Sequence, residues 1–184
     1  MLKVTSQELF KVTRTQAPKI KFKGGFMEKQ LLKDLASGLI GELTHLHPKK
    51  AVKGLSPAIA RKKPINLDHS CWDLLHHTVF WQDILLKNLE GEFMDWYPPH
   101  NKNWPSDEDL NDDDNFTGLL DKFNKNLEIA ATKLENINLL DRIKIGKPLP
   151  PNVTYFRILL VFLQHTSYHL GQLVTTRKLL GDWK

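Results

Sequence analysis

The sequence has little cysteine and no long hydrophobic run, and each absence excludes a class of protein. Cys71 is the only cysteine in 184 residues, so an intramolecular disulfide is impossible and no C-x-x-C motif exists. The longest uninterrupted apolar run, ILLVFL at 158–163, is far shorter than the ~20 residues that cross a bilayer. The first residues, MLKVTSQELFKVTRTQ, contain no apolar core of a signal peptide. We therefore expect a cytoplasmic protein that does not enter a membrane.

The charge is basic overall but unevenly distributed. Net charge is +5 and the pI is about 9.2, which raises the question of nucleic-acid binding. Much of the basic excess lies in the first 63 residues, as KIKFKGG, HPKK and ARKK, whereas the middle contains the acidic run SDEDLNDDDN. No basic stretch carries the interleaved aromatic residues that stack on bases. We expect a solvated basic segment and no nucleic-acid partner.

The acidic run does not read as a calcium site. It lacks the central glycine and the terminal glutamate of a calcium-binding loop. Negative charge is favourable at the positive end of a helix. We therefore expect Asp107–Asp114 to stabilise the N-terminus of the helix that follows.

Strand-like alternation is also missing, and apolar residues instead recur at three- and four-residue spacing. Residues 1–25 show no clean period and are left unassigned, while 26–184 read as one domain. The second helix is expected to start at Asp68 or Ser70, which can both cap it, and to end at Gly91. The last helix is expected to stop at Gly181. The predicted long helices cover 26–47, 70–90, 115–137 and 154–180.

Four amphipathic helices without strands predict an all-α four-helix bundle. The connections between helices 1 and 2 and between helices 2 and 3 are long, and the first holds a short helix or turn at 51–64. The connection at 91–114 is longer than an antiparallel helix pair needs. A crossover between parallel neighbours needs such length, so we predict up-down-down-up order. Gly38 and Gly41 interrupt the first helix, which predicts close packing on a neighbour or room for a pocket.

The stretch HTSYHLGQ places two histidines one turn apart on the last helix. His165 and His169 share an apolar stripe with Ile158 and Phe162, so both are expected to face the bundle interior. Residues at i and i+4 are about 5–6 Å apart at Cβ, which lets both imidazoles reach one ion. Two hydrogen-bonded core histidines would show the same spacing, and this alternative stays open.

A third histidine lies on a comparable stripe of the second helix. His77 recurs with Leu74, Trp81 and Ile84, so it can meet the histidine pair across the core. Three neutral imidazoles that leave one position for water are typical of a catalytic metal site. His76 is turned about 100° from His77, so only one of the two can point at a shared ion. His45 and His47 end the first helix and could approach the same site.

Together, HSCWDLLHHTVFWQDILLKNLEGE and HTSYHLGQLVTTRKLLG resemble the DinB/YfiT-like superfamily. The resemblance spans roughly 26–184 and includes the AVKGL segment, the Trp-Pro pair at 104–105 and the terminal GDW. It implies an up-down-down-up four-helix bundle, often a homodimer, that binds a divalent metal, nickel or zinc in many members. One metal-binding histidine comes from helix two and two come from helix four. On this sequence these positions fall on His77, His165 and His169.

The resemblance also implies a function. In characterised relatives the metal binds the thiolate of a low-molecular-weight cosubstrate such as bacillithiol or mycothiol, so a metal-dependent thiol S-transferase is the leading hypothesis. The alternative is a non-catalytic bundle, metal-stabilised or stress-associated, that acts by binding a partner. The sequence leaves open whether this member is catalytic, which metal it takes and which small molecule it transfers to.

The remaining polar and aromatic residues receive simpler interpretations. Gln172 is a candidate pocket residue that could position a water or support a ligand, although plain packing explains it as well. Tyr168 is expected to be structural or interfacial. Trp72 and Trp81 are expected in the core, and Cys71 is expected to be a small buried filler. The loop tryptophans Trp96 and Trp104 could roof a pocket or cover one end of the bundle.

Overall fold

The structure is a computed structural model that describes residues 26–40, 46–92, 94–96, 98, 102–134, 137–143 and 153–183. The unassigned segment 1–25 and residues 41–45 of the predicted first helix lie outside these ranges. The predicted end of that helix at 46–47 is wrong, because neither residue is helical and His47 instead caps the next helix. The helices are α1 (Phe26–Ile40), α2 (Pro48–Val52), α3 (Pro57–Ala60), α4 (Cys71–Leu89), α5 (Asp107–Leu110), α6 (Asp113–Lys133) and α7 (Tyr155–Leu179). Apart from one isolated bridge between Arg142 and Thr154, the described residues form no β-structure. The all-α prediction is therefore confirmed for this part of the chain.

Local signals set the ends of α4 and α7, the two helices that carry the candidate site. Ser70 caps α4 in a capping box, in which the backbone N–H of Asp73 donates to Ser70 Oγ and that of Ser70 donates to Asp73 Oδ2. Of the two predicted caps, Ser70 is therefore the one used. Gly91 and Gly181 follow α4 and α7 with φ of 84° and 72°, a left-handed conformation that favours glycine. Both predicted helix ends are confirmed.

The acidic connection is more helical than predicted. Ser106 and Asp109 form a second capping box, which starts the short helix α5 where only an irregular connection is expected from the sequence. Asp112 then caps α6, whose first turn contains Asp113 and Asp114, so this helix starts two residues before the predicted Asn115. Periodicity missed these two features because capping by Ser and Asp side chains, not apolar spacing, produces them. The expected negative charge at the start of the helix is present.

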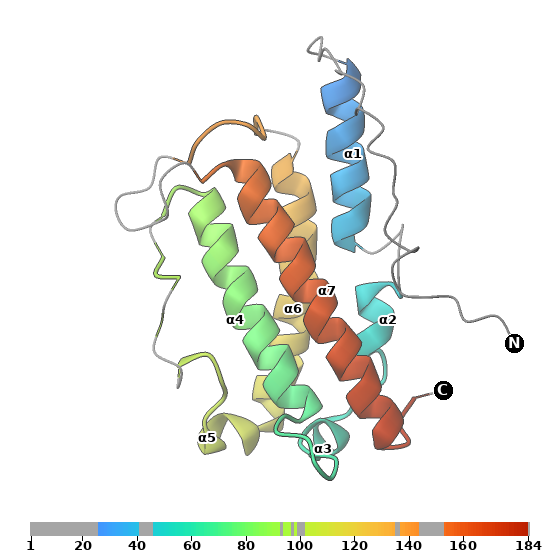
Figure 1. Cartoon of the computed structure of the whole chain (residues 1–184). Coiled ribbons are helices and arrows are strands. Elements are labelled where there is room, and N and C mark those ends of the chain that lie inside the picture. The colour runs from blue at the N-terminus through green and yellow to red at the C-terminus, as the bar shows by residue number, and fades with distance from the viewer. Residues whose placement is uncertain are drawn as a thin grey trace, which may run out of the picture.

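The long helices pack around one apolar core. In Figure 1, α4 lies beside α7 with α6 behind them, and α4 contacts both of these helices while α1 contacts α6. Trp72, Phe116, Phe123 and Phe162 are the largest fully buried side chains. The up-down-down-up order stays a prediction, since the connections run partly through residues outside the described part.

Gly38 in α1 is explained neither by unusually close packing on a neighbouring helix nor by room for a pocket. A Cβ on Gly38 would lie 3.7 Å from Leu163 Cδ2 of α7, which is ordinary van der Waals contact. An alanine therefore fits this position without displacing its neighbour. Gly41 lies outside the described residues.

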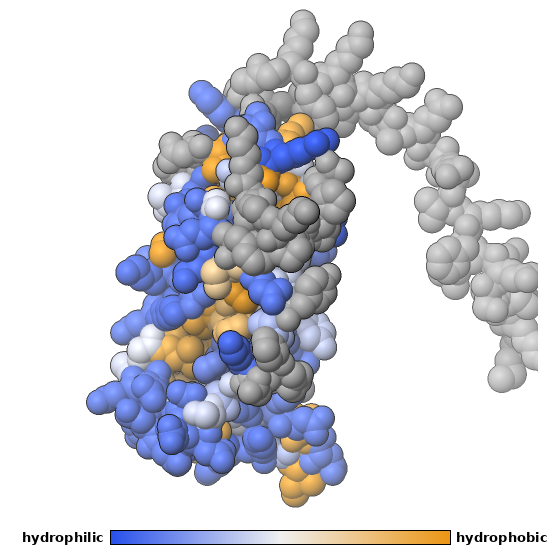
Figure 2. Space-filling view, turned by 90° about the vertical axis from the view of Figure 1, so that its left-hand side faces the viewer, coloured by the Kyte–Doolittle hydropathy of each residue, from blue (hydrophilic) through white to orange (hydrophobic). Residues whose placement is uncertain are grey.

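The surface is mostly hydrophilic on the face that Figure 2 shows, with hydrophobic residues gathered in its middle and at one lower edge. None of the described helices combines the length and the apolar character that crossing a membrane requires. The apolar residues of the long helices serve mainly the bundle core.

Candidate metal centre

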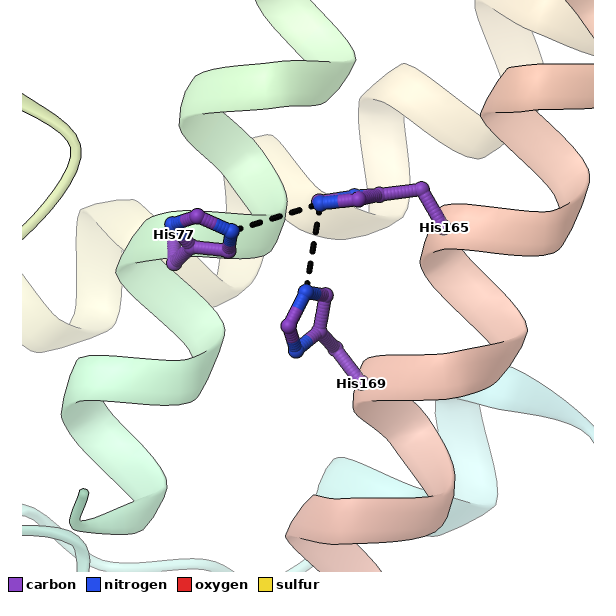
Figure 3. Close-up of side chains that lie close together, drawn as sticks. All are labelled: His77, His165 and His169. Carbon is purple, nitrogen blue, oxygen red and sulfur yellow. Dashed lines mark hydrogen bonds between the residues drawn. The ribbon is translucent and has the colours of Figure 1, made fainter. Parts of the chain in front are cut away.

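Three histidine side chains converge between α4 and α7. Figure 3 shows His77 reaching across from α4 toward His165 and His169, which project one turn apart from α7. His165 Nε2 lies 3.3 Å from His77 Nε2 and 3.1 Å from His169 Nε2. The three ligand-capable nitrogens all lie within 4.8 Å of one another. Among the described residues this is the one group of three or more histidine, cysteine or acidic side chains placed to hold a metal ion.

The nitrogen spacing can be compared with the spacing expected around one metal ion. Two imidazole nitrogens bound to one tetrahedral zinc at about 2.0–2.1 Å lie about 3.4 Å apart. Two of the three nitrogen–nitrogen distances, 3.3 and 3.1 Å, are close to this value, and the third is at most 4.8 Å. The cluster therefore has donor chemistry and a spacing that are compatible with a divalent cation.

The rings are held in the neutral form that metal binding requires. Burial, with smaller contributions from the neighbouring charges of His169 and His77, lowers the pKa of His165 from 6.5 to about 3. Burial and the charge of His169 likewise lower the pKa of His77 to about 4, while the nearby backbone of Asn103 acts in the opposite direction. Burial also lowers the pKa of His169. At neutral pH all three rings can offer a lone pair.

A hydrogen bond from the neighbouring glutamine identifies which nitrogen of His169 carries its proton. Gln172 Oε1 lies 2.7 Å from His169 Nδ1, and an amide oxygen can only accept, so His169 donates from Nδ1. Its Nε2 therefore presents a lone pair to the cluster. Gln172 Nε2 in turn donates to Tyr168 Oη at 3.2 Å, which orients the glutamine.

Hydrogen bonding alone does not satisfy the three nitrogens. His165 Nε2 faces the Nε2 atoms of both other rings, but one N–H can form only one well-aligned hydrogen bond. If the single N–H at His165 Nε2 donates to His169, no donor remains for a lone pair on His77 Nε2. A cation between the rings would accept all three lone pairs at once. This observation weighs against the simple pair of hydrogen-bonded core histidines.

The cluster lies at the seam between two helices and not in the middle of the core. His169 is buried, with 8% of its surface exposed, whereas His77 and His165 are only half-buried. Both α7 histidines point toward α4 as their shared stripe predicts, although His165 is less buried than His169. On the apolar face of α7, His169 is buried and His165 lies nearer the surface, beside α4.

Aromatic rings from separate segments wall the cluster. The Trp104 ring stacks between two imidazoles, 4.4 Å from His77 and 3.9 Å from His69 between ring centroids. Of the two roles considered for Trp104, the structure therefore supports a wall of the site. Trp96 packs partly buried against the core. No sequence signal identifies His69 as part of the site, because its contact depends on a loop about 35 residues further along the chain.

The expectation for Trp81 needs correction, and the structure adds a contact for Tyr168. Trp81 is only half-buried, and its ring lies 5.9 Å from that of His165, so it borders the site and is not a core residue. Tyr168 is 64% exposed, yet its ring lies 4.9 Å from that of His169 and its hydroxyl contacts Gln172. Its role is thus tied to the histidines. Trp72, by contrast, is buried as predicted.

The other candidate residues lie elsewhere. His76 is not part of the cluster, and burial lowers its pKa while the charge of Asp109 raises it. His47 caps α2, with its Nδ1 accepting from the backbone of Lys49, and is not a member of the cluster either. His45 lies outside the described residues. Cys71 is fully buried, as expected of a filler.

One of the three comparisons with known proteins found a match, and it agrees with the helical fold. The sequence model of the DinB superfamily matches residues 49–173, more than half of the chain, and this range contains all three histidines. The search of curated proteins found no match, and neither did the search of solved structures. The chain belongs to the DinB superfamily.

Proposed function

We propose that this protein is a metal-dependent thiol S-transferase whose divalent cation, nickel or zinc, is held by His77, His165 and His169. The observation that carries the proposal is the convergence of three neutral Nε2 atoms at the half-exposed seam of α4 and α7. Three protein ligands leave a coordination position for a substrate. Imidazole ligands suit zinc and nickel alike, so the donor set is compatible with both metals.

The side chains around the cluster have separate roles in the proposed reaction. A bound divalent cation lowers the pKa of a coordinated thiol and so keeps a thiolate available at neutral pH. Gln172 holds the proton of His169 on Nδ1, which leaves Nε2 free. Trp104 stacks on the His77 ring and limits its rotation. The buried setting keeps all three imidazoles uncharged, so no proton has to be displaced from them near pH 7.

The reaction class is transfer of a thiol sulfur to an electrophilic carbon. The thiol gives its proton to solvent, the sulfur forms a bond to carbon, and the leaving group departs with the electron pair of the bond that breaks. Cys71 is not the nucleophile, since burial raises the pKa of its thiol to about 12. The sulfur must therefore come from a small cosubstrate.

The metal site is tested by elemental analysis of protein purified without a histidine tag or an immobilised-metal column. We expect close to one metal per chain in the wild type and a large loss in His169→Ala. His76→Ala is the matched control, because it removes a neighbouring half-buried histidine that is outside the cluster. Equal metal content in all three proteins, or none in any, would contradict the proposal.

Thermal denaturation gives an independent measurement. A metal at 100 times its Kd stabilises the folded state by about 2.7 kcal/mol. For a chain of this size that corresponds to a rise in Tm of roughly 5–10 °C. The rise should vanish in His169→Ala and persist in His76→Ala.

The thiol step is tested separately on cobalt-loaded protein, in which a thiolate bound to the metal produces a charge-transfer absorption band. We expect small thiols to produce this band and an electrophile to consume the thiol catalytically. Tight metal binding without any thiolate band would instead favour the alternative of a metal-stabilised, non-catalytic bundle.

A further inference from the structure

A cavity adjoins the histidine cluster at the end of the bundle where α4 begins. Its volume is about 460 Å³, and it lies between the segment that precedes α4 and the C-terminal half of α7. This volume is in the range of small-molecule sites. None of the three cluster histidines lines it, so it is a separate space beside the proposed metal site.

Shared side chains connect the cavity to the cluster on two sides. Gln172 lines the cavity and accepts the hydrogen bond of His169. Tyr168 also lines it, with its ring 4.9 Å from that of His169. On the opposite side the cavity is lined by His69, which reaches the cluster through the stacked Trp104. A ligand whose sulfur lies at the cluster would therefore extend its remaining atoms toward this cavity.

The lining has a distinct chemical character. It offers hydroxyl and amide groups, and it contains one carboxylate, no lysine and no arginine. The carboxylate belongs to Asp68, which is exposed and forms no ion pair or hydrogen bond with another residue of the described part. A phosphate or carboxylate in the cavity would meet uncompensated negative charge. An ammonium group would meet an unpaired partner. The polar groups come from Asp68, His69, Tyr168, Gln172, Thr175 and Thr176.

We propose that the thiol substrate carries a protonated amine and that Asp68 binds this ammonium group in the cavity while the sulfur reaches the metal site. This inference rests on the proposed function, because it assumes that a thiol binds at the cluster. It adds the charge class of the substrate and names Asp68 as the residue that selects it. The hydroxyl and amide groups of the lining suit further polar substituents on the same molecule.

The test compares pairs of thiols of similar length and opposite charge, on the cobalt-loaded full-length protein. Cysteamine is paired with 3-mercaptopropionate, and 6-aminohexanethiol with 6-mercaptohexanoate, and the thiolate band gives Kd for each. Two chain lengths are used so that at least one amine can place its ammonium group at Asp68 while its sulfur lies at the metal site. Exposed ion pairs contribute about 0.2–1 kcal/mol, so we expect the amine of at least one pair to bind about two- to five-fold more tightly.

Two variants separate the effect of Asp68 on thiol binding from the effect of the protein's net charge. Asp68→Asn should abolish the preference for the amine, and Asp121→Asn, an equal charge change on the exposed face of α6, should retain it. The preference in the wild type should also weaken as salt is added. Both substitutions are at exposed positions, and unchanged melting curves will show that both variants fold.

Two different results would overturn the inference, and they are distinguishable. A thiolate band with no preference for the amine, or with a preference that survives in Asp68→Asn, would overturn the inference and leave the proposed function standing. The absence of a thiolate band with every thiol would overturn the proposed function and the inference together.

Discussion

Gln172 Oε1 accepts a 2.7 Å hydrogen bond from Nδ1 of His169, and this contact leaves the lone pair of His169 Nε2 pointing at the other two histidines. By comparison, His165 Nδ1 is buried and has no hydrogen-bond partner among the described residues. Gln172 is thus the side chain that orients one of the three candidate metal-binding histidines.

Replacing Gln172 should weaken metal binding without removing a ligand. Loss of such a supporting hydrogen bond typically costs 10–100-fold in metal affinity. We expect an effect of about this size for Gln172→Leu in a competition titration with a chromophoric chelator, and near wild-type affinity for Gln172→Glu, which retains an acceptor. Gln164→Leu, an exposed position on the same helix, is the control. Unchanged affinity in Gln172→Leu would show that the glutamine has no supporting role.

The free energy of unfolding of the metal-free protein should decrease as the pH is lowered below 6.5. The pKa values of His165 and His77 are lowered from 6.5 to about 3 and about 4 in the folded state. Below pH 6.5 the unfolded chain therefore binds protons that the folded chain does not, so the free energy of unfolding decreases as the pH falls toward 4. Urea denaturation at several pH values between 7 and 4.5 measures this dependence.

The matched variant for the pH experiment replaces both rings by neutral glutamine. The double variant His77→Gln/His165→Gln should lose stability less steeply between pH 6.5 and 4. If it and the wild type depend on pH with equal slopes, the cluster is not the source of the acid sensitivity.

Cys71 should be unreactive in the folded protein. Its thiol is fully buried and lies 3.8 Å from the carbonyl oxygen of Leu173, and burial raises its pKa to about 12. Little thiolate exists at pH 8, and the reagent has no access to the sulfur. Iodoacetamide should label the chain only after denaturation, as measured by mass spectrometry. Stoichiometric labelling of the native protein would contradict both the burial and the conclusion that the reacting sulfur comes from a small molecule.

Gly38→Ala should stabilise the protein. Glycine inside a helix costs about 1 kcal/mol relative to alanine, and the new Cβ would make only ordinary contact with Leu163 at 3.7 Å. We expect Tm to rise by about 2–4 °C. Gly91→Ala is the opposite case, since φ is 84° there and an alanine would be strained, so its Tm should fall. A lower Tm in Gly38→Ala would mean that α1 and α7 pack more tightly than this distance indicates.

Much of the candidate site follows from helical periodicity. Residues four apart share a helix face, so His165 and His169 had to lie together once that segment was helical. The same argument separates His77 from His76, because neighbours on a helix point about 100° apart. The structure places His77 in the cluster and leaves His76 out.

Other parts of the site could not be predicted in this way. Trp104 lies on an irregular connection, and its position between His69 and His77 depends on how two loops pack against α4. The contact of Tyr168 with Gln172 depends on side-chain rotamers that sequence spacing does not determine. The half-exposed location of His165 depends on how closely α4 approaches α7.

The sequence by itself determined the helical class, the ends of the two site helices and the register of their histidines. It could do so because caps, glycine stops and apolar periodicity act over a few residues along the chain. Only the tertiary structure decided that the three histidines come together, that Trp104 stacks on His77, and that a cavity with one carboxylate adjoins the cluster. These features depend on contacts between segments far apart in the chain, and such contacts exist only once the core has packed.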